Sequence, residues 1–132
     1  MHDEFCLGHE LRWLERFGLN CYGCCEPLHN KVSMLRKIPR LRRISMSTWI
    51  DVDKGAQEMG RDFVFSYKPN PAVLAWDVWD AQEARKQLED VLERTRGCVV
   101  ELIMKDVSTC RSEPRRLWEW CELAVQVAEE YG

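Results

Sequence analysis

The feature that most constrains this chain is a regular alternation of short apolar segments with amphipathic segments. Apolar stretches that begin near positions 19, 41, 62 and 98 have the length and composition of buried strands. After each of them, a polar loop leads into a segment whose apolar residues recur at helical spacing. Strands separated by helices imply right-handed crossovers and a parallel sheet. The pattern therefore predicts an α/β fold with four parallel strands.

The pattern also predicts where each element lies. One helix comes first, and four repeats of strand, loop and helix follow it, which is a natural size for a single domain over residues 1–132. The expected strands cover 19–25, 41–47, 62–67 and 98–104. The expected helices cover 3–17, 27–35, 51–59, 80–96 and 113–131. Gly18, Gly60 and Gly97 directly follow the expected helices 3–17, 51–59 and 80–96, as expected for helix ends.

Four parallel strands form either an open doubly wound sheet or part of a barrel. An eight-stranded barrel needs about 250 residues, and this chain has 132. Half of a barrel would expose two unpaired strand edges and an uncovered apolar face. An open sheet and half of a (β/α)8 TIM-type barrel, preceded by one helix, therefore both fit the pattern. A half-barrel would either form a homodimer with a second copy or belong to a longer chain.

Charge and cysteine content narrow the classes of function. The net charge is −3, from 19 basic and 22 acidic residues, which argues against nucleic acid as the main partner. The basic run 36–43 is better explained as a solvated helix end and loop. Seven cysteines, an odd number, without an apolar leader favour reduced thiols and a cytoplasmic protein. No apolar run approaches the ~18 residues of a membrane span, so we expect no membrane partner.

Every expected strand ends in polar or reactive side chains. In α/β folds such groups collect at the carboxyl ends of the strands. The sequence therefore predicts one pocket for a small-molecule substrate at that edge of the sheet. In chain order the strand ends offer Cys24, Cys25, Glu26 and His29, then Ser47 and Trp49, then Lys68 and Asn70, and finally Lys105, Asp106 and Cys110.

Three of these residues are candidates for catalysis. Lys68 and Lys105 could bind an anionic substrate or, if buried, act as bases with a lowered pKa. Asp106 could be a general acid or base. The same side chains could instead form structural ion pairs, Lys68 or Lys105 with Asp106 or Glu26, and Asp106 could cap the following turn.

Three further residues are candidates for binding the substrate. Ser47 ends the second strand, and Asn70 lies between two prolines that stiffen its loop. Trp49 also follows a strand end, where an aromatic side chain could roof a flat ligand or simply plug the loop.

The cysteines at the first and fourth strand ends raise the question of a metal. In a closed barrel Cys24 and Cys110 could converge on one ion, and His29 or Glu26 could complete a zinc shell. The spacing Cys21 to Cys25 matches no zinc ribbon or finger, however, and cysteine is also well suited to line a buried sheet. Both interpretations stay open on spacing alone.

The strand-end sequences resemble the C-terminal half of the uroporphyrinogen decarboxylase-like superfamily, which includes zinc-dependent corrinoid methyltransferases. LNCYGCCEP falls where those methyltransferases carry a His-x-Cys segment, FVFSYKPNPA resembles a later strand and its loop, and KDVSTC falls where they place a second zinc cysteine. The resemblance implies zinc held by Cys24 and Cys110. Tyr22 stands where the family has histidine, and Glu26 or His29 would take that place.

Two activities follow from the resemblance. The first is methyl transfer, in which zinc activates a thiol acceptor and the methyl group comes from a corrinoid protein. The second is a metal-free, decarboxylase-like lyase in which Lys68 and other cations hold carboxylates. A non-catalytic half-barrel that needs a second half is the alternative from a different class.

Overall fold

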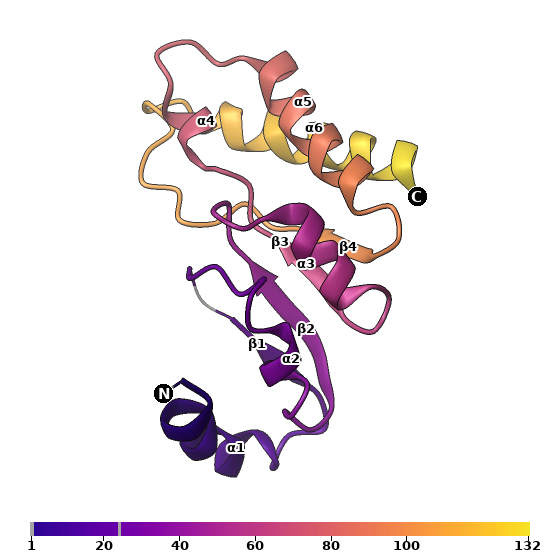
Figure 1. The fold of residues 1–132 in the computed structure, drawn as a ribbon. Helices are drawn as coiled ribbons and strands as arrows, with labels where there is room; N and C mark the ends of the chain where they lie inside the picture. Colours follow the sequence, from indigo (N-terminus) through magenta and orange to yellow (C-terminus); the bar gives the residue numbers. More distant parts are fainter. Residues whose placement is uncertain (1, 24) are drawn as a thin grey trace.

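The computed structural model describes residues 2–23 and 25–132, except for the side chains of His2 and Asp3. A π-helical segment (His2–Leu7) continues into α1 (Gly8–Leu14), after which strands and helices alternate along the chain (Figure 1). The remaining elements are β1 (Asn20–Tyr22), α2 (Val32–Leu35), β2 (Leu41–Met46), α3 (Val52–Met59), β3 (Val64–Tyr67), α4 (Ala72–Ala75), α5 (Ala81–Arg94), β4 (Val99–Leu102) and α6 (Arg115–Tyr131).

The four strands form one parallel sheet in the order β1-β2-β3-β4. Neighbours in the sheet are therefore neighbours in the sequence, and each crossover contains helix. This confirms the prediction of an α/β fold with four parallel strands alternating with helices, an arrangement consistent with half of a barrel. Among the described residues no helix is long and apolar enough to cross a membrane.

Several elements are shorter than the sequence pattern predicts. β1 ends at Tyr22, and the chain then turns at Gly23, where a Cβ atom would lie 1.9 Å from the Cβ of Ser45. Only glycine allows the two strands to approach so closely there. The predicted helix 27–35 is a single turn, α2, and the short helix α4 has no counterpart among the expected elements.

Two helices begin at aspartates that act as N-caps. The Asp51 carboxylate accepts the backbone N–H of Lys54 at the start of α3. The Asp80 carboxylate accepts two backbone N–H groups at the start of α5, at 3.0 and 2.9 Å. A capping side chain satisfies donors that the first helical turn leaves without a partner, so these residues set where each helix starts.

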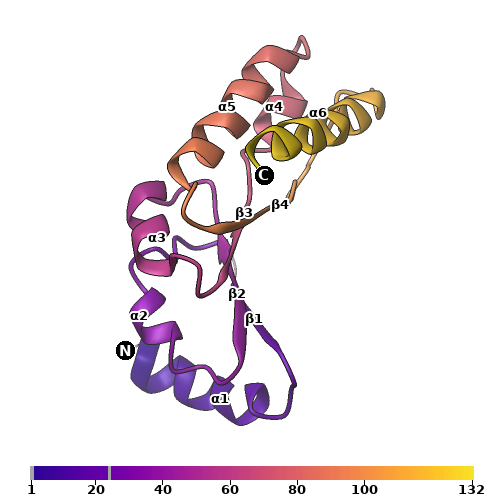
Figure 2. The ribbon, with the colours of Figure 1, turned by 90° about the vertical axis from the view of Figure 1, so that its right-hand side faces the viewer.

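The apolar core lies on one side of the sheet. Figure 2 shows α2 and α3 on the same side of β1 and β2, with no described helix on the other side. Side chains of β2 and β3 such as Ile44, Met46 and Phe65 are buried against these helices. A second cluster joins α4, α5 and α6 and includes Leu88 and Trp120.

The side of the sheet that bears no described helix carries polar side chains. Arg43 on β2 donates a hydrogen bond to Cys21 Sγ on β1 (3.0 Å) and forms an ion pair with Glu101 on β4 (3.0 Å). The Arg43 side chain therefore spans β3, where the small buried residue Ser66 leaves room. The apolar uncovered face expected for half of a barrel is thus partly a charged one.

Candidate functional site

The carboxyl ends of the four strands converge on one small cavity. Its volume is about 50 Å³. The residues that line it come from all four strand ends and are Cys25, Ser47, Thr48, Trp49, Lys68, Pro69, Pro71, Lys105 and Asp106. Among the lining residues are five of the side chains that the sequence places at strand ends and assigns to catalysis or substrate binding. We call this cavity the strand-end pocket.

A thiol, an ammonium group and a carboxylate meet on one wall of the strand-end pocket. Lys105 Nζ lies 2.9 Å from Cys25 Sγ and 3.2 Å from Asp106 Oδ2. Cys25 Sγ lies 3.5 Å from the same carboxylate oxygen. The hydrogen bonds to Cys25 and Asp106 raise the pKa of Lys105, so Lys105 is a firmly charged ammonium. Cys25 Sγ therefore lies in contact with both a positively and a negatively charged side chain.

The backbone of Asp106 adopts a left-handed conformation, with φ of 59°. Aspartate tolerates this conformation better than most residues, because its short side chain can form local hydrogen bonds. Asp106 lies four residues after the end of β4, and its carboxylate forms an ion pair with the neighbouring Lys105. Residues in such conformations gather at functional sites, where the surrounding structure holds them in place.

Lys68 faces the strand-end pocket from the end of β3. Its ammonium group donates to the Ser66 hydroxyl at 3.2 Å and to the Ser66 carbonyl at 3.4 Å, and it pairs with no carboxylate among residues 2–23 and 25–132. Burial lowers the pKa of Lys68, and the positive charge of Lys105 lowers it further. Both effects disfavour the charged form of Lys68. An anion bound between the two lysines would favour this charged form and so counteract both effects.

The hydroxyl of Ser47 is a second group without a partner. Ser47 is 5 % exposed, and its Oγ has no hydrogen-bond partner within the described part of the chain. A buried hydroxyl left in this state costs roughly 1–3 kcal/mol. Because Ser47 also lines the strand-end pocket, a ligand with a hydrogen-bonding group could recover that free energy.

The size of the strand-end pocket limits what it can hold. A single water needs ~10–15 Å³ of such space, and drug-sized ligands occupy roughly 300–1,000 Å³. The observed volume of about 50 Å³ suits one small group such as a carboxylate. Any larger ligand would extend out of the pocket, over the edge of the sheet.

The described members of the expected zinc shell, Glu26, His29 and Cys110, do not form a metal-binding group. Glu26 forms an ion pair with Lys31 at 2.6 Å, and Cys110 is not among the residues lining the strand-end pocket. His29 Nε2 lies 2.8 Å from the side-chain nitrogen of Asn30. No group of three or more histidine, cysteine or acidic side chains placed to hold a metal ion occurs among the described residues. Cys24 lies outside those residues, so zinc binding stays a prediction.

The expected substrate-binding residues divide between two places. Ser47 and Trp49 line the strand-end pocket, and Trp49 does so from an exposed position. Asn70 lies outside it, and its side-chain oxygen accepts the backbone N–H of Ala72 at 3.0 Å. This hydrogen bond joins Asn70 to the first residue of the short helix α4, whose N-cap is Pro71.

The sequence pattern gave no role to three residues that the structure makes prominent. Cys25, for which the sequence suggested no specific role, contacts Lys105. β1 ends three residues before Cys25, so the expected strand 19–25 stops short of it. Arg43 and Glu101 form an ion pair across the sheet. Their signal in the sequence is weak: Glu101 is the one charged residue in β4, but β2 contains two neighbouring arginines, Arg42 and Arg43.

No protein-family model, curated protein or solved structure matches this chain. The function of the strand-end pocket is therefore inferred from its own chemistry.

Proposed function

We propose that the strand-end pocket binds the carboxylate group of a small-molecule substrate and that the protein acts as a metal-free, decarboxylase-like lyase. The observation that carries the proposal is the position of Lys68, a partly buried cation that pairs with no carboxylate within the described residues, beside the second cation Lys105. The unpartnered Ser47 hydroxyl supports it, because it offers a hydrogen bond to the same ligand.

The groups in the strand-end pocket match the needs of a decarboxylation. The bond between the carboxylate and the adjacent carbon breaks, carbon dioxide leaves, and the electron pair stays on the substrate carbon. Nearby positive charge, here from Lys68 and Lys105, stabilises that electron pair. The substrate carbon then takes a proton, for which the Lys105 ammonium, hydrogen-bonded to Asp106, is the placed donor. Water restores the proton on Lys105.

A binding experiment tests the first step with succinate as the probe. Calorimetric titration should show succinate binding at low salt, weaker binding at higher salt, and no binding of neutral succinamide. Lys68→Met should abolish the binding. The matched control is Lys86→Met, which removes an exposed lysine of α5 that does not line the strand-end pocket. Equal binding by the Lys68→Met and wild-type chains would refute the proposal.

Methyl transfer is a second candidate, favoured by the 2.9 Å contact between Cys25 and Lys105. A Cys25 thiolate would attack the methyl group, a sulfur–carbon bond would form, and the leaving group would keep the electron pair. The donor proposed from the family resemblance is a corrinoid protein, which would approach from the open side of the strand-end pocket. Methyl iodide tests the acceptor: Cys25 should be methylated faster than the exposed Cys6 and Cys121, and equal rates would exclude this role.

A further inference from the structure

Helix α6 carries two apolar stripes, although α5 covers only one of them. The first stripe is buried in the cluster with α5 and comprises Trp120, Ala124 and Val127. The second stripe is exposed and comprises Trp118, Cys121, Val125 and Ala128. Two of its members are large apolar side chains, Trp118 at 66 % and Val125 at 57 % exposure. A helix that only packs against α5 does not need the second stripe.

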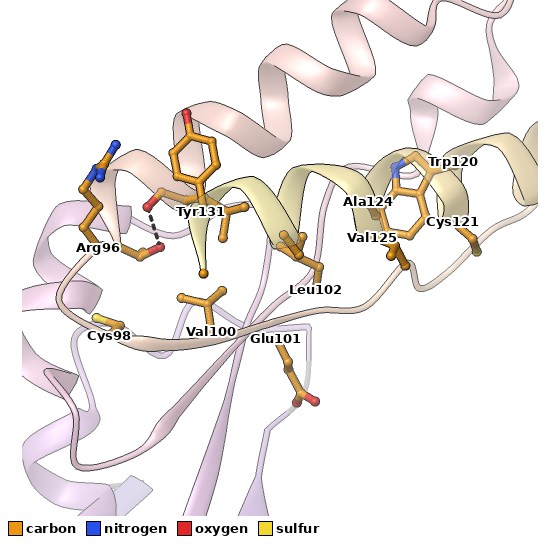
Figure 3. A pocket seen from close by; sticks show the side chains of 14 residues that line it. Arg96, Cys98, Val100, Glu101, Leu102, Trp120, Cys121, Ala124, Val125 and Tyr131 are labelled. Carbon is orange, nitrogen blue, oxygen red and sulfur yellow. Dashed lines mark hydrogen bonds between the residues drawn. The ribbon is translucent and has the colours of Figure 1, made fainter.

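The second stripe borders an apolar groove between α6 and the edge of the sheet. The groove has a volume of about 450 Å³, and α6 and β4 supply most of its lining. Figure 3 shows Val100 and Leu102 of β4 pointing toward α6, while Glu101 points away from it. Three residues of the exposed stripe line the groove, namely Cys121, Val125 and Ala128. We call it the α6 groove.

The α6 groove lies beside a strand edge with unused hydrogen-bonding groups. In the described sheet β4 pairs only with β3, and β1 pairs only with β2, so one edge of each is open. Open edges of this kind are templates for pairing with another strand. Leu19, directly before β1, is 74 % exposed and adds an apolar side chain at the opposite edge of the sheet.

The two segments of the chain that hold the sheet edges carry opposite net charge. Residues 20–46, from β1 through β2, contain six basic residues and one acidic residue. Residues 99–132, from β4 through α6, contain four basic and seven acidic residues. A second copy of the chain can therefore present its basic edge to the acidic edge of the first, and this complementarity favours head-to-tail pairing of the edges.

We propose that the α6 groove is the docking site for the β1 edge of a second copy of this chain. The β1 strand of each copy would pair with β4 of the other, parallel to it, so that each α6 covers one junction. Two such junctions close eight parallel strands into a (β/α)8 TIM-type barrel with twofold symmetry. The strand-end pockets of both copies then open at the same end of the barrel. Residues of both copies could together surround a substrate larger than one carboxylate, which a single chain cannot enclose.

Sedimentation analysis of two charge variants tests this arrangement. Leu19→Asp places an acid on the basic edge, where it meets the acidic edge of the other copy. Val125→Lys places a base in the α6 groove, where it meets the basic edge. We expect the wild-type chain to be a dimer and each variant to raise the dimer dissociation constant by about 100-fold. The control Val78→Asp changes another exposed valine, one outside the α6 groove, and should stay dimeric.

Mixing the two variants gives the sharpest result. A dimer of one Leu19→Asp chain and one Val125→Lys chain has one native junction, and its other junction sets aspartate beside lysine. The mixture should therefore recover the dimer that neither variant forms alone. A monomeric wild-type chain, a mixture that stays monomeric, or an open-ended series of larger assemblies would overturn the proposal. Circular dichroism of each variant checks that the fold is kept.

This inference and the proposed function can fail separately. A monomer that binds succinate would support the carboxylate site and refute the dimer. A dimer that does not bind succinate would support the dimer and refute the carboxylate site.

Discussion

Replacing Ser47 with alanine should make the protein more stable, which is the opposite of the usual effect of a buried mutation. The Ser47 hydroxyl is buried and has no hydrogen-bond partner among the described residues. Its removal relieves a desolvation cost of roughly 1–3 kcal/mol. We therefore expect Ser47→Ala to raise the free energy of unfolding by at least about 1 kcal/mol, which corresponds to a rise of roughly 4 °C in Tm for a chain of this size.

Ser66 supplies the matched comparison. It is also a buried serine at a strand end, but its hydroxyl accepts a hydrogen bond from the Lys68 ammonium at 3.2 Å. A hydrogen bond to a charged group contributes about 1.5–3 kcal/mol. Ser66→Ala should therefore lower the free energy of unfolding by an amount in that range.

Urea unfolding followed by tryptophan fluorescence measures both changes. Protein concentration must be held constant, because the stability of a dimer depends on it. The wild-type chain should also gain stability on adding succinate. Ser47→Ala should gain less, since it has lost the hydroxyl of a residue that lines the strand-end pocket. A Ser47→Ala chain destabilised as much as Ser66→Ala would show that Ser47 is satisfied and would refute this reasoning.

Three further predictions concern charge and ionisation. The pKa of Lys68 is lowered in the folded state, so the free energy of unfolding should rise as the pH increases from that lowered pKa toward the ordinary lysine value. Lys68→Met should be more stable than the wild-type chain near neutral pH and should not show this rise. An unchanged pH profile of stability in Lys68→Met would contradict the prediction. Lys105→Met should slow iodoacetamide labelling of Cys25 by roughly tenfold, measured by peptide mass spectrometry, and an unchanged rate would argue against a stabilised thiolate. Burial and the hydrogen bond to Glu10 raise the pKa of Tyr22. The contribution of Tyr22 to stability is therefore fully present below the ordinary tyrosine pKa of about 10 and is lost as the pH rises above it. Tyr22→Phe should lower the free energy of unfolding by about 1 kcal/mol at neutral pH and should lose less stability than the wild-type chain at alkaline pH, and an equal loss would contradict this.

The sequence pattern predicts the order and type of the main elements because the apolar core lies between the helices and one side of the sheet. The helices that cover β2 and β3 must present apolar residues at helical spacing, because they pack against buried strand residues such as Ile44 and Phe65. The convergence of Lys68 and Lys105 follows from the parallel sheet, since parallel strands place their carboxyl ends at one edge.

The pattern of apolar and polar residues does not predict contacts that depend on the detailed course of the backbone. The end of β1 at Tyr22 depends on the close approach of Gly23 to Ser45, and this end decides that Cys25 faces Lys105. The hydrogen bond from the Ala72 backbone N–H to the Asn70 side chain depends on α4, a single turn too short to show a period. Both features are set by tertiary packing.

The α6 groove illustrates a different limit. The two apolar stripes of α6 can be counted in the sequence, but only the folded chain shows that α5 covers one and leaves the other beside the open edge of β4.

The central claim is that Lys68 binds the carboxylate of a ligand. The pKa of Lys68 with and without succinate tests this claim most directly. NMR titration of the lysine side chains, assigned with Lys68→Met, gives both values. In the free protein the pKa should lie below the ordinary value of 10.5, and bound succinate should raise it, because a carboxylate favours the charged form. A Lys68 pKa that stays the same in saturating succinate would contradict the account.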